Sequence, residues 1–139
     1  MTGPDLVIHI DGGSRGNPGD AGFGVYVEAP DGSATELYGY LGRATNNVAE
    51  YQALLHALRH ALARGAARVR IFSDSELVVR QIAGQYKVKH PDMIPLHQEA
   101  RSLMRRFEQA TLEHVRREQN READRLANRA LDERASKLD

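Results

Sequence analysis

The sequence predicts an α/β fold in which a mixed sheet of five strands, three antiparallel and two parallel, carries helices on both faces. Two observations support this prediction. Three strand-like segments joined by short turns come first, and they are typical of an antiparallel meander. From about Asn47 the apolar residues change to helical spacing, and strands then alternate with helices. Helices between the later strands imply parallel crossovers.

The predicted strands are short apolar runs bounded by turn residues. The first, Val7–Ile10, is followed by the carboxylate of Asp11 and a turn rich in Gly, Asn and Pro, which is expected to end the strand there. A strong turn signal at 30–33 separates the second strand from the third. The four later strands are expected over residues 21–28, 34–41, 68–73 and 111–115.

The predicted helices have recognisable ends. Gly65 is expected to end the longest helix as a C-cap, and Gly84 the next one. Pro95 is tolerable because it falls in a first turn. Asn120 is expected to cap the last helix. The helices are predicted over residues 47–64, 75–83, 93–109 and from Asn120 onward.

Composition narrows the class of protein. A chain of 139 residues without repeats or linkers suits one domain, expected over residues 1–139. The lack of cysteine excludes disulfides, thiolate zinc sites and cysteine nucleophiles, and agrees with the cytoplasmic location that we expect. No stretch approaches the roughly 18 apolar residues of a membrane span. Formal net charge is zero, so any nucleic-acid contact must use a local basic patch. We expect a monomer that does not bind membranes.

Four of the nineteen acidic residues stand at transitions between predicted elements. Asp11 and Asp74 end strands, whereas Glu50 and Asp124 lie in the first turns of helices. Such positions direct carboxylates to the sheet margin beyond the carboxyl ends of parallel strands, where α/β proteins bind ligands. Converging carboxylates cannot all stay ionised without cations, and hard oxygen ligands select magnesium or manganese over zinc. Two such ions about 4 Å apart would suit a phosphodiester displacement.

Each carboxylate also has an open structural explanation. Asp11 beside a glycine is ordinary turn chemistry. Glu50 stands three residues after Asn47 and could complete a capping box, and Asp74 lies beside a second one. Asp124 could merely complement a helix dipole. The combination of all four favours the metal site over these separate explanations.

Four motifs, in this order and spacing, resemble the type 1 ribonuclease H family over nearly the whole chain. They are Asp11-Gly12-Gly13-Ser14-Arg15-Gly16-Asn17-Pro18-Gly19, Thr45-Asn46-Asn47-Val48-Ala49-Glu50, Phe72-Ser73-Asp74-Ser75 and Asn120-Arg121-Glu122-Ala123-Asp124-Arg125-Leu126-Ala127. The resemblance implies a ribonuclease H-like fold and endonucleolytic hydrolysis of the RNA strand of RNA–DNA hybrids, giving 5′-phosphate and 3′-hydroxyl ends. It implies two Mg²⁺ ions, with Mn²⁺ as an alternative, that activate water and stabilise the departing oxygen. The implied catalytic ligands are Asp11, Glu50, Asp74 and Asp124.

The resemblance also implies substrate contacts. Asn17, Asn46 and Asn47 match polar residues that contact ribose 2′-hydroxyls, and an amide can donate and accept as a 2′-hydroxyl does. Arg43 and Thr45 match a pocket for a phosphate of the DNA strand, which a guanidinium fork and a hydroxyl suit. The open alternative for these five residues is loop polarity and helix capping.

Two departures from the family pattern resemble a compact subgroup found in archaea and many bacteria. The short loop before the last helix, residues 116–120, holds no histidine, and Arg117 is its candidate cation near the reacting phosphate. His114 falls in the preceding strand, where we expect a packed or solvent-facing imidazole. Some members of this subgroup also cleave double-stranded RNA. A basic, Trp-containing insertion is replaced by a loop with only Lys87, Lys89 and His90.

Two other functions remain open from the sequence. A non-catalytic nucleic-acid-binding module of the same fold would be favoured by loss of an acidic ligand, and none is lost. A different nuclease or an integrase of this fold would share the acids, but not usually the context Thr45-Asn46-Asn47. The hybrid nuclease is the leading hypothesis.

Overall fold

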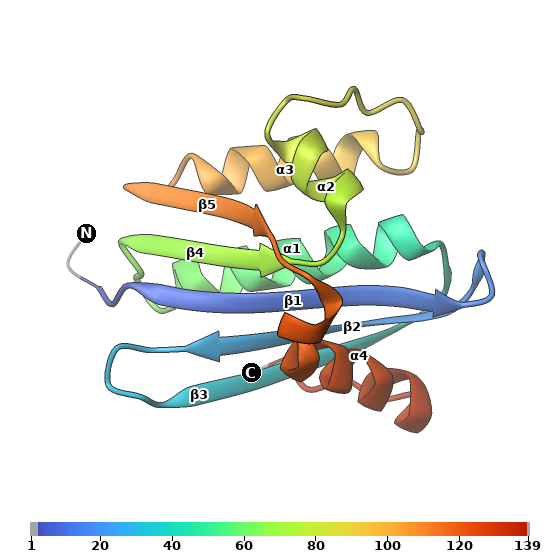
Figure 1. Ribbon diagram of the computed structural model, residues 1–139, viewed down its shortest axis with the longest axis horizontal. Helices are drawn as coiled ribbons and strands as arrows, with labels where there is room; N and C mark the ends of the chain where they lie inside the picture. Colours follow the sequence, from blue (N-terminus) through green and yellow to red (C-terminus); the bar gives the residue numbers. More distant parts are fainter. Residues whose placement is uncertain (1–2, 139) are drawn as a thin grey trace.

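The computed structural model describes residues 3–138, which form a twisted five-stranded sheet in the order β3-β2-β1-β4-β5 (Figure 1). The strands are β1 (Leu6–Arg15), β2 (Gly19–Glu28), β3 (Ala34–Ala44), β4 (Arg68–Ser73) and β5 (Gln109–His114). The helices are α1 (Asn46–Ala63), α2 (Glu76–Ile82), α3 (Ile94–Met104) and α4 (Arg121–Glu133), with a 3-10 turn η1 (Arg117–Gln119).

The mixed topology predicted from the sequence is confirmed. Strands β1, β2 and β3 pair antiparallel, because short turns join them. Strand β4 pairs parallel with β1, and β5 pairs parallel with β4, because helices provide the crossovers. The central strand β1 therefore has an antiparallel neighbour on one side and a parallel neighbour on the other.

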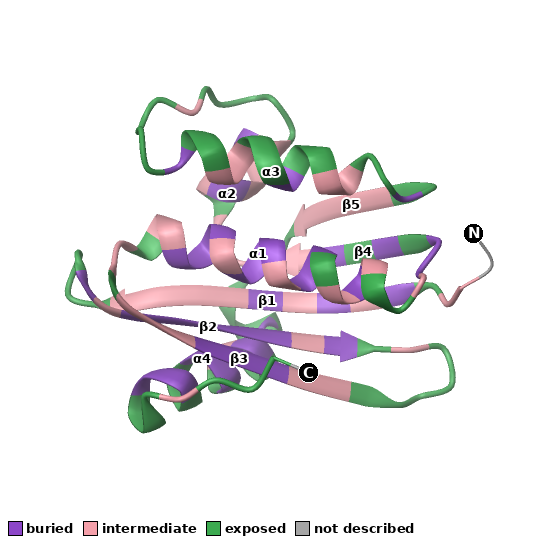
Figure 2. Ribbon diagram, turned by 180° about the vertical axis from the view of Figure 1, so that it is seen from behind, coloured by how far each residue is buried: buried purple, intermediate pink, exposed green. Residues whose placement is uncertain are grey.

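Helices cover both faces of the sheet, as predicted (Figures 1 and 2). Helix α1 packs on β1 and β2 on one face and is itself covered by α3, so most of its apolar stripe is buried. Helix α4 packs on β2, β1 and β3 on the opposite face. The main core lies between α1 and the sheet, and within residues 3–138 no helix is long and apolar enough to cross a bilayer.

Two glycines allow α1 and α4 to approach the sheet closely. A Cβ at Gly12 would lie 2.4 Å from the carbonyl oxygen of Ala49, at the start of α1. A Cβ at Gly24 would lie 2.3 Å from the carbonyl oxygen of Ala123, at the start of α4. Because contacts this short are not tolerated, the missing side chains bring the first turns of both helices against the centre of the sheet.

Several predicted boundaries were wrong. Strand β1 does not end at Asp11 but continues to Arg15, because Gly12 to Arg15 keep pairing with β2. Strand β3 likewise extends to Ala44, where it still pairs with Gly19. Helix α3 stops at Met104 instead of residue 109, because the chain turns so that Gln109 can begin β5 opposite β4.

Candidate active site

Three of the four predicted carboxylates come together where β4 ends beside β1. The parallel pairing stops at Ile10 opposite Ser73, so Asp11 and Asp74 follow the last paired residues on neighbouring strands. Glu50 reaches the same point from α1, just past the first turn in which the sequence had placed it, because the helix begins at Asn46. One carboxylate oxygen from each of Asp11, Glu50 and Asp74 lies within 4.8 Å of the other two. This separation suits oxygen ligands that share a cation.

Glu50 is buried and held by two hydrogen bonds. The backbone N–H of Gly12 donates to Oε1 at 2.5 Å, and the Ser73 hydroxyl donates to Oε2 at 2.9 Å. The capping role that the sequence left open for Glu50 is wrong, because the N-cap of α1 is Thr45, whose Oγ1 accepts from Val48 N–H. Glu50 is therefore oriented toward the other carboxylates and away from the helix end.

Burial makes this carboxylate group difficult to ionise. Desolvation, with the nearby charges of Glu50 and Asp74, raises the pKa of Asp11 to about 10. Desolvation also raises the pKa of Glu50 to about 7, although the bonds from Gly12 and Ser73 favour its charged form. The pKa of Asp74 is raised by desolvation and held back by Arg117. All-oxygen donors that cannot ionise together without a counter-charge fit a divalent cation.

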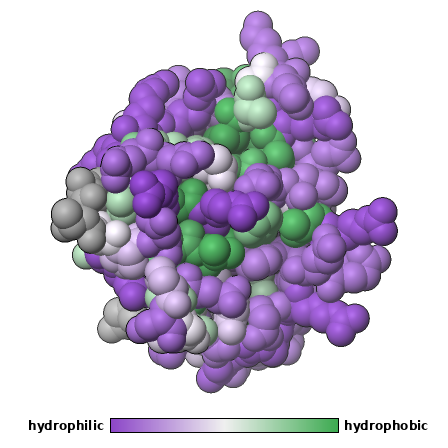
Figure 3. All heavy atoms as spheres, turned by 60° about the vertical axis from the view of Figure 1, so that its left-hand side comes forward, coloured by the Kyte–Doolittle hydropathy of each residue, from purple (hydrophilic) through white to green (hydrophobic). Residues whose placement is uncertain are grey.

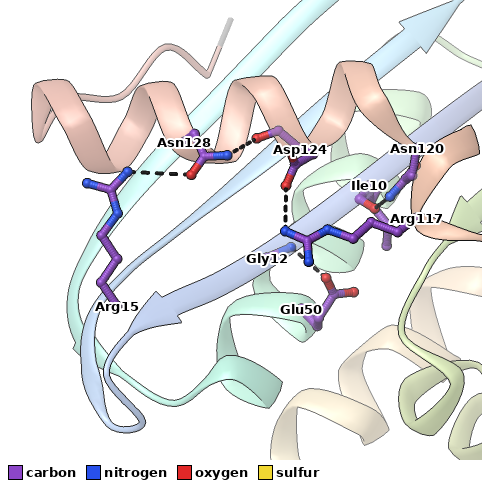
Figure 4. A network of polar contacts seen from close by, with 8 residues as sticks. All are labelled: Ile10, Gly12, Arg15, Glu50, Arg117, Asn120, Asp124 and Asn128. Atoms are coloured by element: carbon purple, nitrogen blue, oxygen red, sulfur yellow. Dashed lines mark hydrogen bonds and ion pairs between the residues drawn. The ribbon is translucent and has the colours of Figure 1, made fainter.

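Asp124 lines the same cleft from the first turn of α4 (Figure 4), close enough to Asp11 to help raise the pKa of Asp11. The Nδ2 of buried Asn120 donates to the carbonyl oxygen of Ile10 at 2.8 Å and so fixes the start of α4 against β1. The predicted cap was wrong in its detail, because the Asn120 side chain bonds to the strand and not to the helix end. Asp124 is half-exposed and faces the guanidinium of Arg117, whose Nη2 is 4.0 Å from Oδ1.

This cleft has a volume of about 620 Å³. Its floor is the extended part of β1, and its rim includes Arg117 as well as His114 at the end of β5. His114 is exposed at the end of β5, so the solvent-facing imidazole predicted from the sequence is confirmed, but its place at the rim of the cleft was not predicted. The register could have indicated it, since His114 pairs with Ser73, the residue before Asp74.

A second hollow lies where β1, β4 and β5 begin, with a volume of about 360 Å³. Figure 3 shows this end of the molecule, where hydrophobic atoms are visible between hydrophilic side chains. Ion pairs of Arg68 with Asp5 and of Arg70 with Glu113 cross it. Its charges are thus already neutralised, in contrast to the carboxylates of the main cleft.

The predicted substrate-contact residues lie in the turn after β1, at the end of β3 and at the start of α1. Asn46 Oδ1 accepts hydrogen bonds from Ser14 N–H at 2.6 Å and from Ser14 Oγ at 3.0 Å. Asn17 Oδ1 accepts from Asn46 N–H at 3.2 Å. Both carbonyl oxygens are bonded within the protein and both residues are exposed, so the Nδ2 donors of these amides remain available to a ligand. Asn47 is half-buried beside them in the first turn of α1.

The two residues of the predicted phosphate pocket come from the end of β3 and the N-cap position of α1. Arg43 is exposed near the end of β3, opposite Asp20 in the register between β3 and β2. Thr45 follows two residues later, and its hydroxyl oxygen accepts the capping bond from Val48. The hydroxyl proton of Thr45 remains available to a phosphate oxygen, since this bond uses only a lone pair.

The chain is similar to known proteins over most of its length. A family model described as Reverse transcriptase-like matches residues 9–130. The bifunctional protein Rv2228c of Mycobacterium tuberculosis is 48% identical over 129 residues, covering 91% of this chain and 35% of that protein. Ribonuclease HI of Halobacterium salinarum is 42% identical over 126 residues, covering 90% of this chain and 63% of the relative. The chain thus spans about a third of one relative and less than two thirds of the other.

A solved structure gives the same result for the fold. LC11-RNase H1 in complex with an RNA/DNA hybrid matches with a TM-score of 0.86 at 38% identity. The match covers 93% of this chain and 98% of that one. The chain therefore shares its overall fold with that protein.

Proposed function

The chain belongs to the type 1 ribonuclease H family, and on that premise we propose that it is an endoribonuclease that hydrolyses the RNA strand of RNA–DNA hybrids. The observation that carries the proposal is the approach of carboxylate oxygens of Asp11, Glu50 and Asp74 within 4.8 Å, with Asp124 lining the same cleft beside Asp11. The hybrid bound by the structural neighbour LC11-RNase H1 supports the choice of substrate. We infer one ribonuclease H domain over residues 1–139, acting as a monomer because one chain supplies all four carboxylates.

We infer that Asp11, Glu50, Asp74 and Asp124 hold two Mg²⁺ ions, with Mn²⁺ as an alternative. The all-oxygen donor set and the raised pKa values of Asp11, Glu50 and Asp74 support this choice. Bound ions would activate water and stabilise the departing 3′-oxygen. The chain itself orients their ligands, since Gly12 and Ser73 fix Glu50 and Asn120 fixes the start of α4.

Recognition of RNA is assigned to the amides beside the cleft. The available Nδ2 groups of Asn17 and Asn46 can donate to a 2′-hydroxyl oxygen, a group that DNA lacks. Asn47 lies beside them and completes the predicted set. Arg43 and Thr45 are assigned to a phosphate of the DNA strand, for which a guanidinium fork and a free hydroxyl proton are suited.

The direct test compares four labelled substrates, each with Mg²⁺ or with a chelator: RNA–DNA hybrid, double-stranded RNA, single-stranded RNA and double-stranded DNA. Cleavage of the hybrid only with Mg²⁺ is expected, with 5′-phosphate ends on the products. The double-stranded RNA reaction determines whether the substrate range is broader. Hybrid binding without cleavage would instead indicate a non-catalytic module of the same fold.

Arg117→Ala is expected to lower turnover by about tenfold or more, which corresponds to about 1.4 kcal/mol of barrier. Its guanidinium faces the cleft beside Asp124, where it can stabilise charge that builds on the phosphate in the transition state. Arginine cannot exchange protons near neutral pH, so its effect is electrostatic. Turnover at saturating hybrid is the measurement, and Arg116→Ala is the matched control. Equal turnover in wild type and both variants would show that this loop has no catalytic cation.

Hybrid binding is expected to depend only modestly on salt, with a slope of log affinity against log salt of about −4 or shallower. Each neutralised phosphate adds about 0.7–0.9 to the slope, and the exposed loop between α2 and α3 offers only Lys87, Lys89 and His90. Binding is measured across a salt series without metal. Lys87→Ala should reduce the slope by about 1, whereas Lys137→Ala in the C-terminal tail should not. A slope implying about ten contacts would contradict this prediction.

A further inference from the structure

The four carboxylates of the cleft are not equivalent. Asp11, Glu50 and Asp74 each offer an oxygen within 4.8 Å of the other two. Asp124 completes no such mutual group, although it lies close enough to help raise the pKa of Asp11 and of Asp74. Asp124 instead faces Arg117, with 4.0 Å between Oδ1 and Nη2 (Figure 4). The guanidinium of Arg117 therefore lies beside Asp124, the carboxylate that would help to bind a second divalent ion.

In the ion pair between Arg117 and Asp124, the arginine side chain is largely exposed, whereas its backbone is fixed by hydrogen bonds. The Arg117 side chain is 81% exposed, whereas the Asp124 side chain is 36% exposed. The backbone of Arg117 belongs to η1, and its carbonyl oxygen accepts a hydrogen bond from the N–H of Asn120. The side chain of Asn120 in turn fixes this end of the loop against β1. The guanidinium can thus leave Asp124 while its backbone stays in place, because exposed ion pairs contribute little stability.

We propose that Arg117 is the resident counter-ion of Asp124 and competes with a divalent cation for that carboxylate until a substrate phosphate draws the guanidinium away. The inference rests on the proposed function, since it assigns Arg117 two successive anions, Asp124 in the free protein and a phosphate in the complex. The first three carboxylates form the stronger cation position. The position that includes Asp124 is the weaker one in the free protein.

Electrostatics sets the expected size of the competition. A guanidinium and a divalent ion beside the same carboxylate repel each other across about 5 Å, and in a water-like dielectric this weakens binding of the ion by about tenfold before salt screening. Screening and the freedom of an exposed side chain reduce the effect. Removal of the charge should therefore tighten the weaker position by about three- to tenfold.

The test is a Mn²⁺ titration of the free protein at low salt, followed by electron paramagnetic resonance of the unbound ion, with no nucleic acid present. Wild type should show one stronger and one weaker position. Arg117→Ala should bind the second ion about three- to tenfold more tightly, whereas Arg117→Lys and the neighbouring control Arg116→Ala should behave as wild type. Adding Asp124→Asn to Arg117→Ala should remove the gain.

Three results would overturn the inference: an unchanged or weaker second position in Arg117→Ala, an equal gain in Arg116→Ala, or a gain that survives Asp124→Asn. Thermal melting in chelator checks that each variant is folded. Because the titration contains no substrate, its failure leaves hybrid cleavage untouched. Conversely, a chain that cleaves no hybrid can still show the competition.

Discussion

Asp74→Asn is expected to lower the rate of hybrid cleavage by about a thousandfold or more while the protein stays folded. The amide keeps the shape of the side chain but loses the anionic oxygen that a hard cation requires. Loss of a bound metal position removes several kcal/mol of transition-state stabilisation, and about 4 kcal/mol corresponds to a thousandfold. Folding should persist because Ser75, not Asp74, caps α2 by accepting from Val78 N–H.

Turnover and thermal melting of the same preparation provide the measurement. Asp31→Asn is the control, because it makes the same change of atoms in the turn between β2 and β3, at the opposite end of the sheet from the cleft (Figure 1). The control should retain wild-type turnover. Wild-type activity in Asp74→Asn would exclude Asp74 from the metal site.

The sequence was sufficient to place the candidate carboxylates because their positions follow from local patterns. Asp11 and Asp74 come at or after the ends of apolar runs, and parallel pairing of those runs brings such residues to one edge. The two amphipathic helices were equally visible. The first turn of α4 carries Asp124 as predicted, but Glu50 lies just past the first turn of α1, because that helix begins at Asn46. The spacing of apolar residues and the order of strands and helices along the chain were thus enough to place these four carboxylates at the cleft.

Other features depend on contacts between distant segments, which no local pattern contains. A Gly-rich stretch is typical of a turn, yet β1 continues to Arg15 because β2 supplies partners for its backbone. The buried Glu50 is held by Gly12 and Ser73, which are 38 and 23 residues away along the chain. His114 reaches the cleft only through its register with β4. These are consequences of tertiary packing, and therefore sequence reasoning missed them.

Asp11→Asn is expected to stabilise the metal-free protein at pH 8 by about 1–3 kcal/mol, although it should abolish cleavage. In the folded protein the pKa of Asp11 is raised to about 10 from an ordinary value of 3.8, chiefly by burial. A tenfold change in the acid dissociation constant between the unfolded and folded protein corresponds to about 1.36 kcal/mol, and shared protons within the carboxylate group reduce the total. For a chain of 139 residues the gain corresponds to a rise in Tm of about 3–10 °C.

The sign of the pH dependence follows from proton binding. Between pH 4 and pH 10 the folded protein keeps a proton on Asp11 that the unfolded chain has released, so the free energy of unfolding falls as pH rises. The advantage of Asp11→Asn should therefore be small near pH 4 and grow toward pH 8. Added Mg²⁺ should reverse the order, because only wild type offers the full set of anionic ligands. Thermal melting at several pH values, in chelator and in Mg²⁺, measures these differences in stability. If Asp11→Asn were less stable than wild type in chelator at pH 8, the pKa of Asp11 would not be raised in the folded protein.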